Sequence, residues 1–226
     1  SATSGLLAAC KAVGLGPGDE FITTPYSMSA TTAAGVFCGA TPVFVDIEPD
    51  YFCLDVTRVP EAITRKTKAI IVTNLFGHPA QLKALRYIAD NRGIKLIEDN
   101  AQGILATEGG KYAGTIGHIG IFSLNVHKHI QAGEGGVVCT SDDELADKLR
   151  GLRNHGELVE NPGSMVGLNL RMTETTAAIA CAQFSKVEKL VAGRIALAKA
   201  LSSAVEELDG LIAPVVREGC TSSFYI

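Results

Sequence analysis

Residues 119–138 read IGIFSLNVHKHIQAGEGGVV, an apolar run followed by a polar loop and a glycine cluster. The apolar run predicts a buried strand that ends near Leu124, and a second strand is expected to begin after the glycines, near Gly136. Lys128 lies in the loop between them, where the apolar flanks favour a partly buried position. Burial favours the neutral amine, the form that condenses with an aldehyde. Because a loop lysine is more commonly solvent-exposed, the interpretation of Lys128 depends on other segments.

A second segment, residues 94–102, reads IKLIEDNAQ, an apolar strand that ends in two carboxylates and an amide. Ligands bind at the carboxyl ends of strands in parallel sheets. Asp99 is the candidate there, because a carboxylate at that edge can pair with a protonated ring nitrogen. Taken alone, Asp99 is better explained as a helix cap or as a member of an ion pair.

The third segment is the start of the chain, where residues 1–14 read SATSGLLAACKAVG. Small hydroxylated residues precede an apolar helical pattern, and the free N–H groups at a helix start favour a phosphate. Thr3 and Ser4 also offer hydroxyl donors. The simpler alternative is an ordinary N-cap.

Strands and helices alternate along the chain, which predicts an α/β fold with a mostly parallel central sheet covered by helices on both faces. The expected strands lie near residues 20–24, 42–46, 69–73, 95–98, 119–124 and 136–140. Helices are expected near residues 4–13, 30–38, 60–63, 81–91 and 142–154, and the alanine-rich residues 173–208 predict one or two long helices.

Seven segments, taken together and in this order, resemble the DegT/DnrJ-type nucleotide-sugar aminotransferases, a branch of the fold-type I enzymes that use pyridoxal 5′-phosphate (PLP). They are residues 1–6, 14–20, 39–46, 98–102, 122–136, 152–156 and 167–171. The resemblance implies a PLP-dependent transferase that moves an amino group from L-glutamate, or alternatively glutamine, to a nucleotide-linked keto sugar. It also implies a role in making the amino sugars of polysaccharides.

The resemblance also assigns roles to individual residues. Lys128 becomes the lysine that holds PLP as an aldimine, and Asp99 becomes the partner of the pyridine nitrogen. Gln102 is expected near the cofactor ring and its phenolic oxygen.

The remaining implied positions concern the cofactor's phosphate. Ser123, with Ala2 and Thr3, is expected to bind it. Asn169 is expected to reach the phosphate in the neighbouring subunit, which makes the expected assembly a homodimer with shared active sites. A buried structural amide is the alternative for Asn169.

One position departs from the family pattern. The family commonly stacks an aromatic ring on the cofactor, and alignment on Ala30 and Thr31 places Met28 in that position. Methionine makes favourable contacts with rings, so stacking is retained in altered form. Tyr26 is a second candidate for the stacking residue, and a core position for Met28 is a third interpretation.

Some relatives carry histidine in place of the lysine and act as sugar dehydratases. The family places the key residue five positions after the phosphate-binding serine and five before the first glycine of the cluster. Lys128 satisfies both counts, from Ser123 and to Gly133, whereas His127 and His129 satisfy neither. Transamination is therefore favoured over dehydration, and over a non-catalytic regulatory relative, which would lack Asp99 or Lys128.

Composition narrows the remaining possibilities. The formal net charge is −4 with no basic block, which argues against nucleic-acid and anionic-membrane partners. No apolar run approaches the roughly 18 residues of a membrane span. The glycines at residues 14–18 follow a helix, which argues against a nicotinamide-binding loop. Six scattered cysteines indicate reduced thiols, and we expect a cytoplasmic protein with no metal site.

The expected domain division places a large PLP-binding α/β domain at residues 1–190. Residues 191–226 are expected to form a connecting helix and the start of a truncated C-terminal small domain, because residues 220–226 resemble that domain's first strand.

Overall fold

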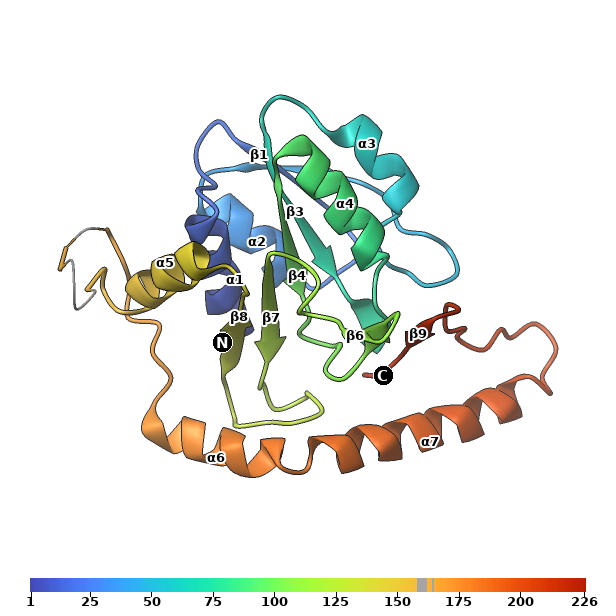
Figure 1. Cartoon of the computed structure of the whole chain (residues 1–226). Coiled ribbons are helices and arrows are strands. Elements are labelled where there is room, and N and C mark those ends of the chain that lie inside the picture. Colours follow the sequence, from blue (N-terminus) through green and yellow to red (C-terminus); the bar gives the residue numbers. More distant parts are fainter. Residues whose placement is uncertain (158–161, 164) are drawn as a thin grey trace.

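The computed structural model describes residues 1–157, 162–163 and 165–226 (Figure 1). Its central sheet has the strand order β2-β1-β3-β4-β7-β8. Neighbouring strands are parallel except that β8 is antiparallel to β7. The bounds are β1 Glu20–Thr23, β2 Thr41–Phe44, β3 Thr67–Thr73, β4 Lys95–Asp99, β7 Ile119–Ser123 and β8 Gly136–Cys139.

Helices pack on both faces of this sheet. Successive residues of a strand point to opposite faces, so each strand contributes side chains to the core on either side. In β3, Ala69 and Ile71 join the core that includes residues of α1, α2 and α5, whereas Ile70 and Val72 join the core beneath α3 and α4. The helices are α1 Ala2–Ala12, α2 Ser29–Phe37, α3 Val59–Ala62, α4 Leu82–Arg92 and α5 Asp143–Arg153. The predicted fold class is confirmed, and each expected strand and helix occurs with bounds shifted by a few residues.

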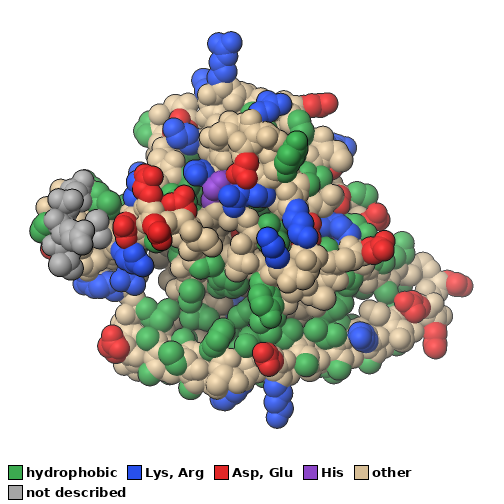
Figure 2. All heavy atoms as spheres, in the orientation of Figure 1, with side chains coloured by type: hydrophobic (Ala, Val, Ile, Leu, Met, Phe, Trp, Pro, Cys, Tyr) green, Lys and Arg blue, Asp and Glu red, His purple; other side chains and the backbone are tan. Residues whose placement is uncertain are grey.

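The alanine-rich segment forms two helices, α6 Glu174–Phe184 and α7 Val187–Val205. They run along one side of the domain as a long arm (Figure 1). Figure 2 shows hydrophobic side chains gathered between this arm and the body of the domain. Val187 and Val191 of α7 pack there with Leu124, Ile130 and the loop that carries Lys128. The arm therefore supports the β7–β8 loop from outside the sheet.

A second, smaller sheet was not predicted from the sequence. Its strands are β5 Thr107–Glu108, β6 Lys111–Tyr112 and β9 Cys220–Thr221, in the order β6-β5-β9. β9 pairs antiparallel with β5, so the last residues of the chain return to the domain at the edge of this small sheet (Figure 1).

The expected domain boundary after residue 190 falls within α7, and the division stays a prediction. Among the helices of the described residues, none has the length and apolar character needed to span a membrane.

Candidate active site

Asp99 is the last residue of β4 and lies at the carboxyl edge of the sheet, with only 3% of its surface exposed. Thr31 of α2 donates its hydroxyl to Asp99 Oδ2 at 2.7 Å, and the Ala101 N–H donates to Oδ1 at 3.2 Å. No ion pair among the described residues includes Asp99, and a turn, not a helix, follows it. The helix-cap and ion-pair alternatives for Asp99 are therefore wrong.

Burial raises the pKa of the Asp99 carboxyl above its usual value. The Thr31 hydroxyl, the Ala101 N–H and the positive charge of Lys128 oppose this rise. The charge of Lys128 thus acts on Asp99, although the two residues follow different strands. Asp99 pairs with Ile121 in the register of β4 and β7, and Lys128 lies in the loop after β7, so the two predicted catalytic residues lie at the same edge of the sheet.

Lys128 lies in the β7–β8 loop and is half-buried, so the exposed-lysine alternative is wrong. Its Nζ lies 4.3 Å from the centre of the Tyr225 ring, within the range of a cation–π interaction. The loop is shaped by Asn125, whose N–H donates to Ser123 Oγ at 3.3 Å and whose side-chain amide donates to Glu134 at 2.7 Å.

The residues around Tyr225 fix its backbone. The Tyr225 N–H donates to the Phe76 carbonyl at 2.9 Å, and Arg194 of α7 donates to the Tyr225 carbonyl at 2.6 Å. Buried His129 makes a hydrogen bond from Nε2 to the Ser223 carbonyl at 2.9 Å, which gives this histidine an anchoring role; His127 is exposed. Tyr225 was missed in the sequence, since it lies 97 residues after Lys128 with no shared local pattern.

The start of α1 offers free donors beside the end of β7. Ser1 is the N-cap of α1 and accepts from the Ser4 N–H. The chain start is therefore an N-cap, but this cap uses only the Ser4 N–H. The N–H groups of Ala2 and Thr3 precede the first intrahelical bond, which runs from the Gly5 N–H to the Ser1 carbonyl.

Gly136 connects this helix start to Ser123. Ser123 and Gly136 are paired in the register of β7 and β8. A Cβ added to Gly136 would lie 2.5 Å from the Ser1 carbonyl oxygen and 2.7 Å from the Ala2 nitrogen, so only glycine allows this approach. The three predicted phosphate-binding residues, Ala2, Thr3 and Ser123, therefore lie together.

Gln102 is half-buried and accepts from the Phe76 N–H through Oε1 at 2.7 Å. Met28 precedes α2, the helix that carries Thr31, and 69% of its surface is exposed. The core interpretation of Met28 is therefore wrong. Tyr26 packs against Phe52 and Phe76, with ring centres 6.3 and 6.2 Å away.

Asn169 is exposed and lies apart from these residues. It forms a bridge with Asn154 after α5, and its Oδ1 accepts from the Arg171 N–H at 3.4 Å. The buried-amide alternative for Asn169 is therefore wrong. Its expected contact with a neighbouring subunit stays a prediction.

Residues 1–225 match the model of the DegT/DnrJ/EryC1/StrS aminotransferase family. The chain belongs to this family. UDP-N-acetyl-3-dehydro-alpha-D-glucosamine 3-aminotransferase of Acidithiobacillus ferrooxidans is 40% identical over 195 residues, which cover 86% of this chain and 53% of that protein. The pleiotropic regulatory protein of Geobacillus stearothermophilus is 39% identical over 211 residues, which cover 93% of this chain and 57% of that protein.

A solved structure of the S. venezuelae protein DesV, in complex with a ketimine intermediate, is similar with a TM-score of 0.95 and 35% sequence identity. The likeness covers 100% of this chain and 61% of that one. This chain therefore spans between about half and three fifths of the length of these relatives.

Membership of the DegT/DnrJ/EryC1/StrS family implies PLP as cofactor, and the residues present fit it. A buried carboxylate without an ion-pair partner suits a protonated pyridine nitrogen. Lys128 offers a primary amine for the aldehyde, and the start of α1 offers N–H groups for the phosphate. In the described part of the chain, no group of three or more His, Cys, Asp or Glu residues is placed to hold a metal ion.

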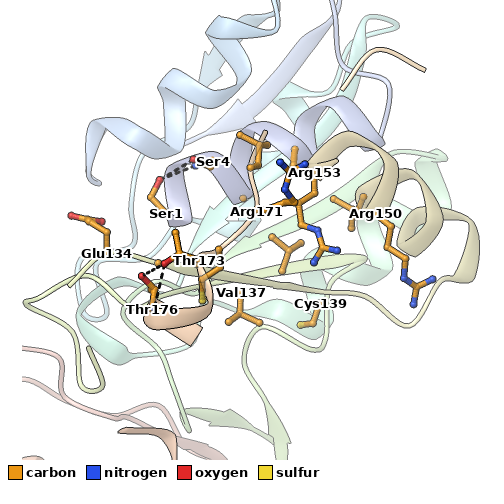
Figure 3. Close-up of a pocket in the computed structure, with 18 of the residues that line it drawn as sticks. Ser1, Ser4, Glu134, Val137, Cys139, Arg150, Arg153, Arg171, Thr173 and Thr176 are labelled. Atoms are coloured by element: carbon orange, nitrogen blue, oxygen red, sulfur yellow. Dashed lines mark hydrogen bonds between the residues drawn. The ribbon is translucent and has the colours of Figure 1, made fainter. Parts of the chain in front are cut away.

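A cleft of about 690 Å³ lies apart from Asp99 and Lys128. It runs along β8 between the start of α1, α5 and the residues before α6 (Figure 3). Arg150, Arg153 and Arg171 line it, but neither Asp99 nor Lys128 does.

Proposed function

We propose that the protein is a PLP-dependent aminotransferase that moves an amino group from an amino acid, L-glutamate, to a nucleotide-linked keto sugar. The observation that carries this proposal is that buried Asp99 ends β4, whereas Lys128 lies in the loop after β7, the neighbouring parallel strand, so both lie at one carboxyl edge of the sheet. The family and the sugar aminotransferase named among the relatives support the reaction class and the substrate class.

PLP, when bound, supplies an electron sink for the substrate's α carbon. Asp99 would accept a hydrogen bond from the protonated ring nitrogen, and its negative charge would keep that nitrogen protonated. Lys128 would hold the cofactor through Nζ, and once the amino donor displaces it, the freed amine would carry the proton taken from the substrate's α carbon. Acid–base assistance of this kind contributes about 10²–10⁴-fold in rate.

Binding of the cofactor falls to the surrounding residues. The N–H groups of Ala2 and Thr3 and the Ser123 hydroxyl hold the phosphate, since they converge beside Gly136. Gln102 lies beside the ring and its phenolic oxygen. Met28 is the stacking residue, because its side chain is exposed one helical turn from Thr31, whereas Tyr26 already packs against two other rings.

The proposed assembly is a cytoplasmic homodimer in which Asn169 reaches the phosphate bound by the partner subunit. The exposure of Asn169, outside its own subunit's site, supports this arrangement. Residues 1–190 would form the large domain and residues 191–226 the entry into a small domain.

Two alternatives belong to the same family. A dehydratase would require histidine at position 128. A regulatory role is suggested by the name of the Geobacillus relative. A regulatory protein, however, would not require Asp99 and Lys128 at the same edge of the sheet.

The test is an amino-transfer assay of the full-length protein with PLP, glutamate or glutamine, and a panel of nucleotide-linked keto sugars. Transfer to at least one sugar is expected, and Lys128→Ala is expected to abolish it. Borohydride reduction followed by peptide mapping should place the cofactor on Lys128. Cofactor on a different lysine, or full transfer by the alanine variant, would overturn the proposal.

A further inference from the structure

Three hydroxyl groups lie between α2, β3 and Asp99. Thr31 donates to Asp99 Oδ2 at 2.7 Å. Ser27 Oγ lies 2.9 Å from Thr31 Oγ1 and 2.9 Å from Thr73 Oγ1. Thr31 and Thr73 are buried, and Thr73 is paired with Asp99 in the register of β3 and β4.

The number of protons on the three hydroxyls determines which hydroxyl donates in each of their hydrogen bonds. A hydroxyl has one proton to donate and can accept as well. The Thr31 proton goes to Asp99, so the bond between Thr31 and Ser27 must use the Ser27 proton. The bond between Ser27 and Thr73 must then use the Thr73 proton. While Asp99 is ionised, the three hydroxyls form one chain in which every donor points toward the carboxylate.

We propose that Thr31 is a positioning residue for the reaction, and that Thr73, Ser27 and Thr31 form a hydrogen-bond relay that keeps Asp99 ionised and fixes the orientation of its carboxylate. The proposal rests on the proposed function, because it explains how this chain prepares Asp99 for a cationic ring nitrogen. Each Asp99 oxygen accepts one bond from the protein, from Thr31 or from Ala101, and so retains a lone pair for the ring nitrogen.

The relay opposes the effect of burial on Asp99. Burial raises the pKa of its carboxyl, and among the described residues Lys128 is the charged group that opposes this. α2 contributes Thr31, β3 contributes Thr73, and the turn after β4 contributes the Ala101 N–H. When Lys128 is bonded to a cofactor, its charge is no longer available in the same form. Hydroxyl donors supply a stabilisation that does not depend on the state of the lysine.

The chain offers a matched control for removal of the Thr31 hydroxyl. Thr23 at the end of β1 is also fully buried, and its hydroxyl has no hydrogen-bond partner among the described residues. Thr31→Val and Thr23→Val therefore make the same chemical change at equal burial, but only the first removes a donor from Asp99.

The first measurement uses the full-length protein without cofactor. Carbon-13 NMR of labelled aspartate carboxyls follows the titration of Asp99, whose signal is the one lost in Asp99→Asn. Thr31→Val is expected to move the midpoint to higher pH, Thr31→Ser to restore it, and Thr23→Val to leave it unchanged. An unchanged midpoint in Thr31→Val, or an equal shift in Thr23→Val, would overturn the relay.

The second measurement uses the protein loaded with PLP. Thr31→Val is expected to lower the rate of amino transfer about tenfold, the effect of one hydrogen bond to a charged group. The KM for the amino donor should change little, and Thr31→Ser should recover the rate. If the wild-type protein transfers no amino group to any sugar of the panel, the proposed function fails. If Asp99→Asn leaves amino transfer intact, Asp99 has no role in transfer and the relay fails with it. If Asp99→Asn abolishes transfer but Thr31→Val matches Thr23→Val, the relay alone fails.

Discussion

Glu98 and Asp99 are consecutive buried carboxylates with different roles, because β4 points them to opposite faces of the sheet. Glu98 accepts hydrogen bonds from the backbone N–H groups of Gly114, Ile116 and Gly117 and from the Asn74 side chain. These bonds fix the turn before β7. Asp99 accepts only two bonds from the described residues and keeps lone pairs for a ligand. Hydrogen-bond saturation thus distinguishes the structural carboxylate of Glu98 from Asp99, the carboxylate that we propose to be catalytic.

This difference predicts opposite outcomes for two amide substitutions. Glu98→Gln places an amide among backbone donors and is expected to lower the free energy of unfolding by about 2–3 kcal/mol. Asp99→Asn should leave stability near that of the wild type, still bind the cofactor, and reduce amino transfer by about 10²-fold or more. Urea unfolding and the transfer assay check the pair. Near-normal transfer by Asp99→Asn would remove Asp99 from its role.

At the scale of elements, the sequence predicted those parts that follow from local pattern. Short apolar runs that alternate with helical segments identified the six strands of the main sheet, and the rule that ligands bind at carboxyl edges made Asp99 a candidate. The spacing on either side of Lys128 identified the lysine only through resemblance to a family.

Elements and contacts formed between distant segments were not predicted. β5 is two residues long, too short to show a period that identifies it, and its partner β9 lies more than 100 residues later. A strand was expected within residues 220–226, where β9 lies, but its pairing with β5 was not. Thr31 served only to align the Met28 segment, and nothing local shows that its hydroxyl reaches Asp99. Such contacts depend on tertiary packing, which residue periodicity does not encode.

The position of α1 on the sheet depends on a glycine. A Cβ added to Gly5 would lie 2.8 Å from Val138 Cγ2 and 3.2 Å from Ile121 Cγ2. Gly5→Val is therefore expected to push α1 away from β8, destabilise the protein by about 2–3 kcal/mol and weaken PLP binding, because Ala2 and Thr3 move with the helix.

Gly193 in α7 provides the control for Gly5→Val, since nothing lies within 4 Å of an added Cβ there. Gly193→Val is expected to be close to neutral in stability and in cofactor affinity. Chemical unfolding and absorbance titration with PLP measure both quantities. Equal effects of the two substitutions would show that the close approach of α1 to β8 does not matter.

At the scale of the whole molecule, residues 217–225 close the structure around the site. The Ser223 N–H donates to the Gly77 carbonyl, and the Arg217 N–H donates to His78 Nε2 at 3.0 Å. Arg217 also pairs with Glu48 at 2.6 Å. The segment that places Tyr225 over Lys128 is thus attached to the loops after β2 and β3, and the site depends on contacts between distant parts of the chain.

Two of the contacts that join distant segments require neutral histidines. His78 Nε2 accepts from Arg217, and His118 Nδ1 accepts from the Leu96 N–H at 2.9 Å. Burial is the main cause that lowers the pKa of each histidine to about 4. In the unfolded chain the pKa of histidine is about 6.5. Between these values the unfolded state binds protons that the folded state does not bind, so stability is lost as pH falls from about 6.5 toward 4 and is fully present above 6.5.

The expected slope is up to about 1.4 kcal/mol per pH unit for each histidine. Buried Glu98 and Asp99, whose carboxyl pKa values burial raises, act in the opposite direction, so the comparison between variants is the informative measurement. His78→Gln and His118→Asn keep an acceptor near Nε2 and Nδ1, respectively, but cannot be protonated. Urea unfolding from pH 4.5 to 7.5 should show a shallower loss of stability at low pH in each variant than in the wild type. Parallel curves for variant and wild type would mean that the folded and unfolded states protonate the histidine at the same pH. The hydrogen bond that it accepts would then not be the contact that holds its segment in place.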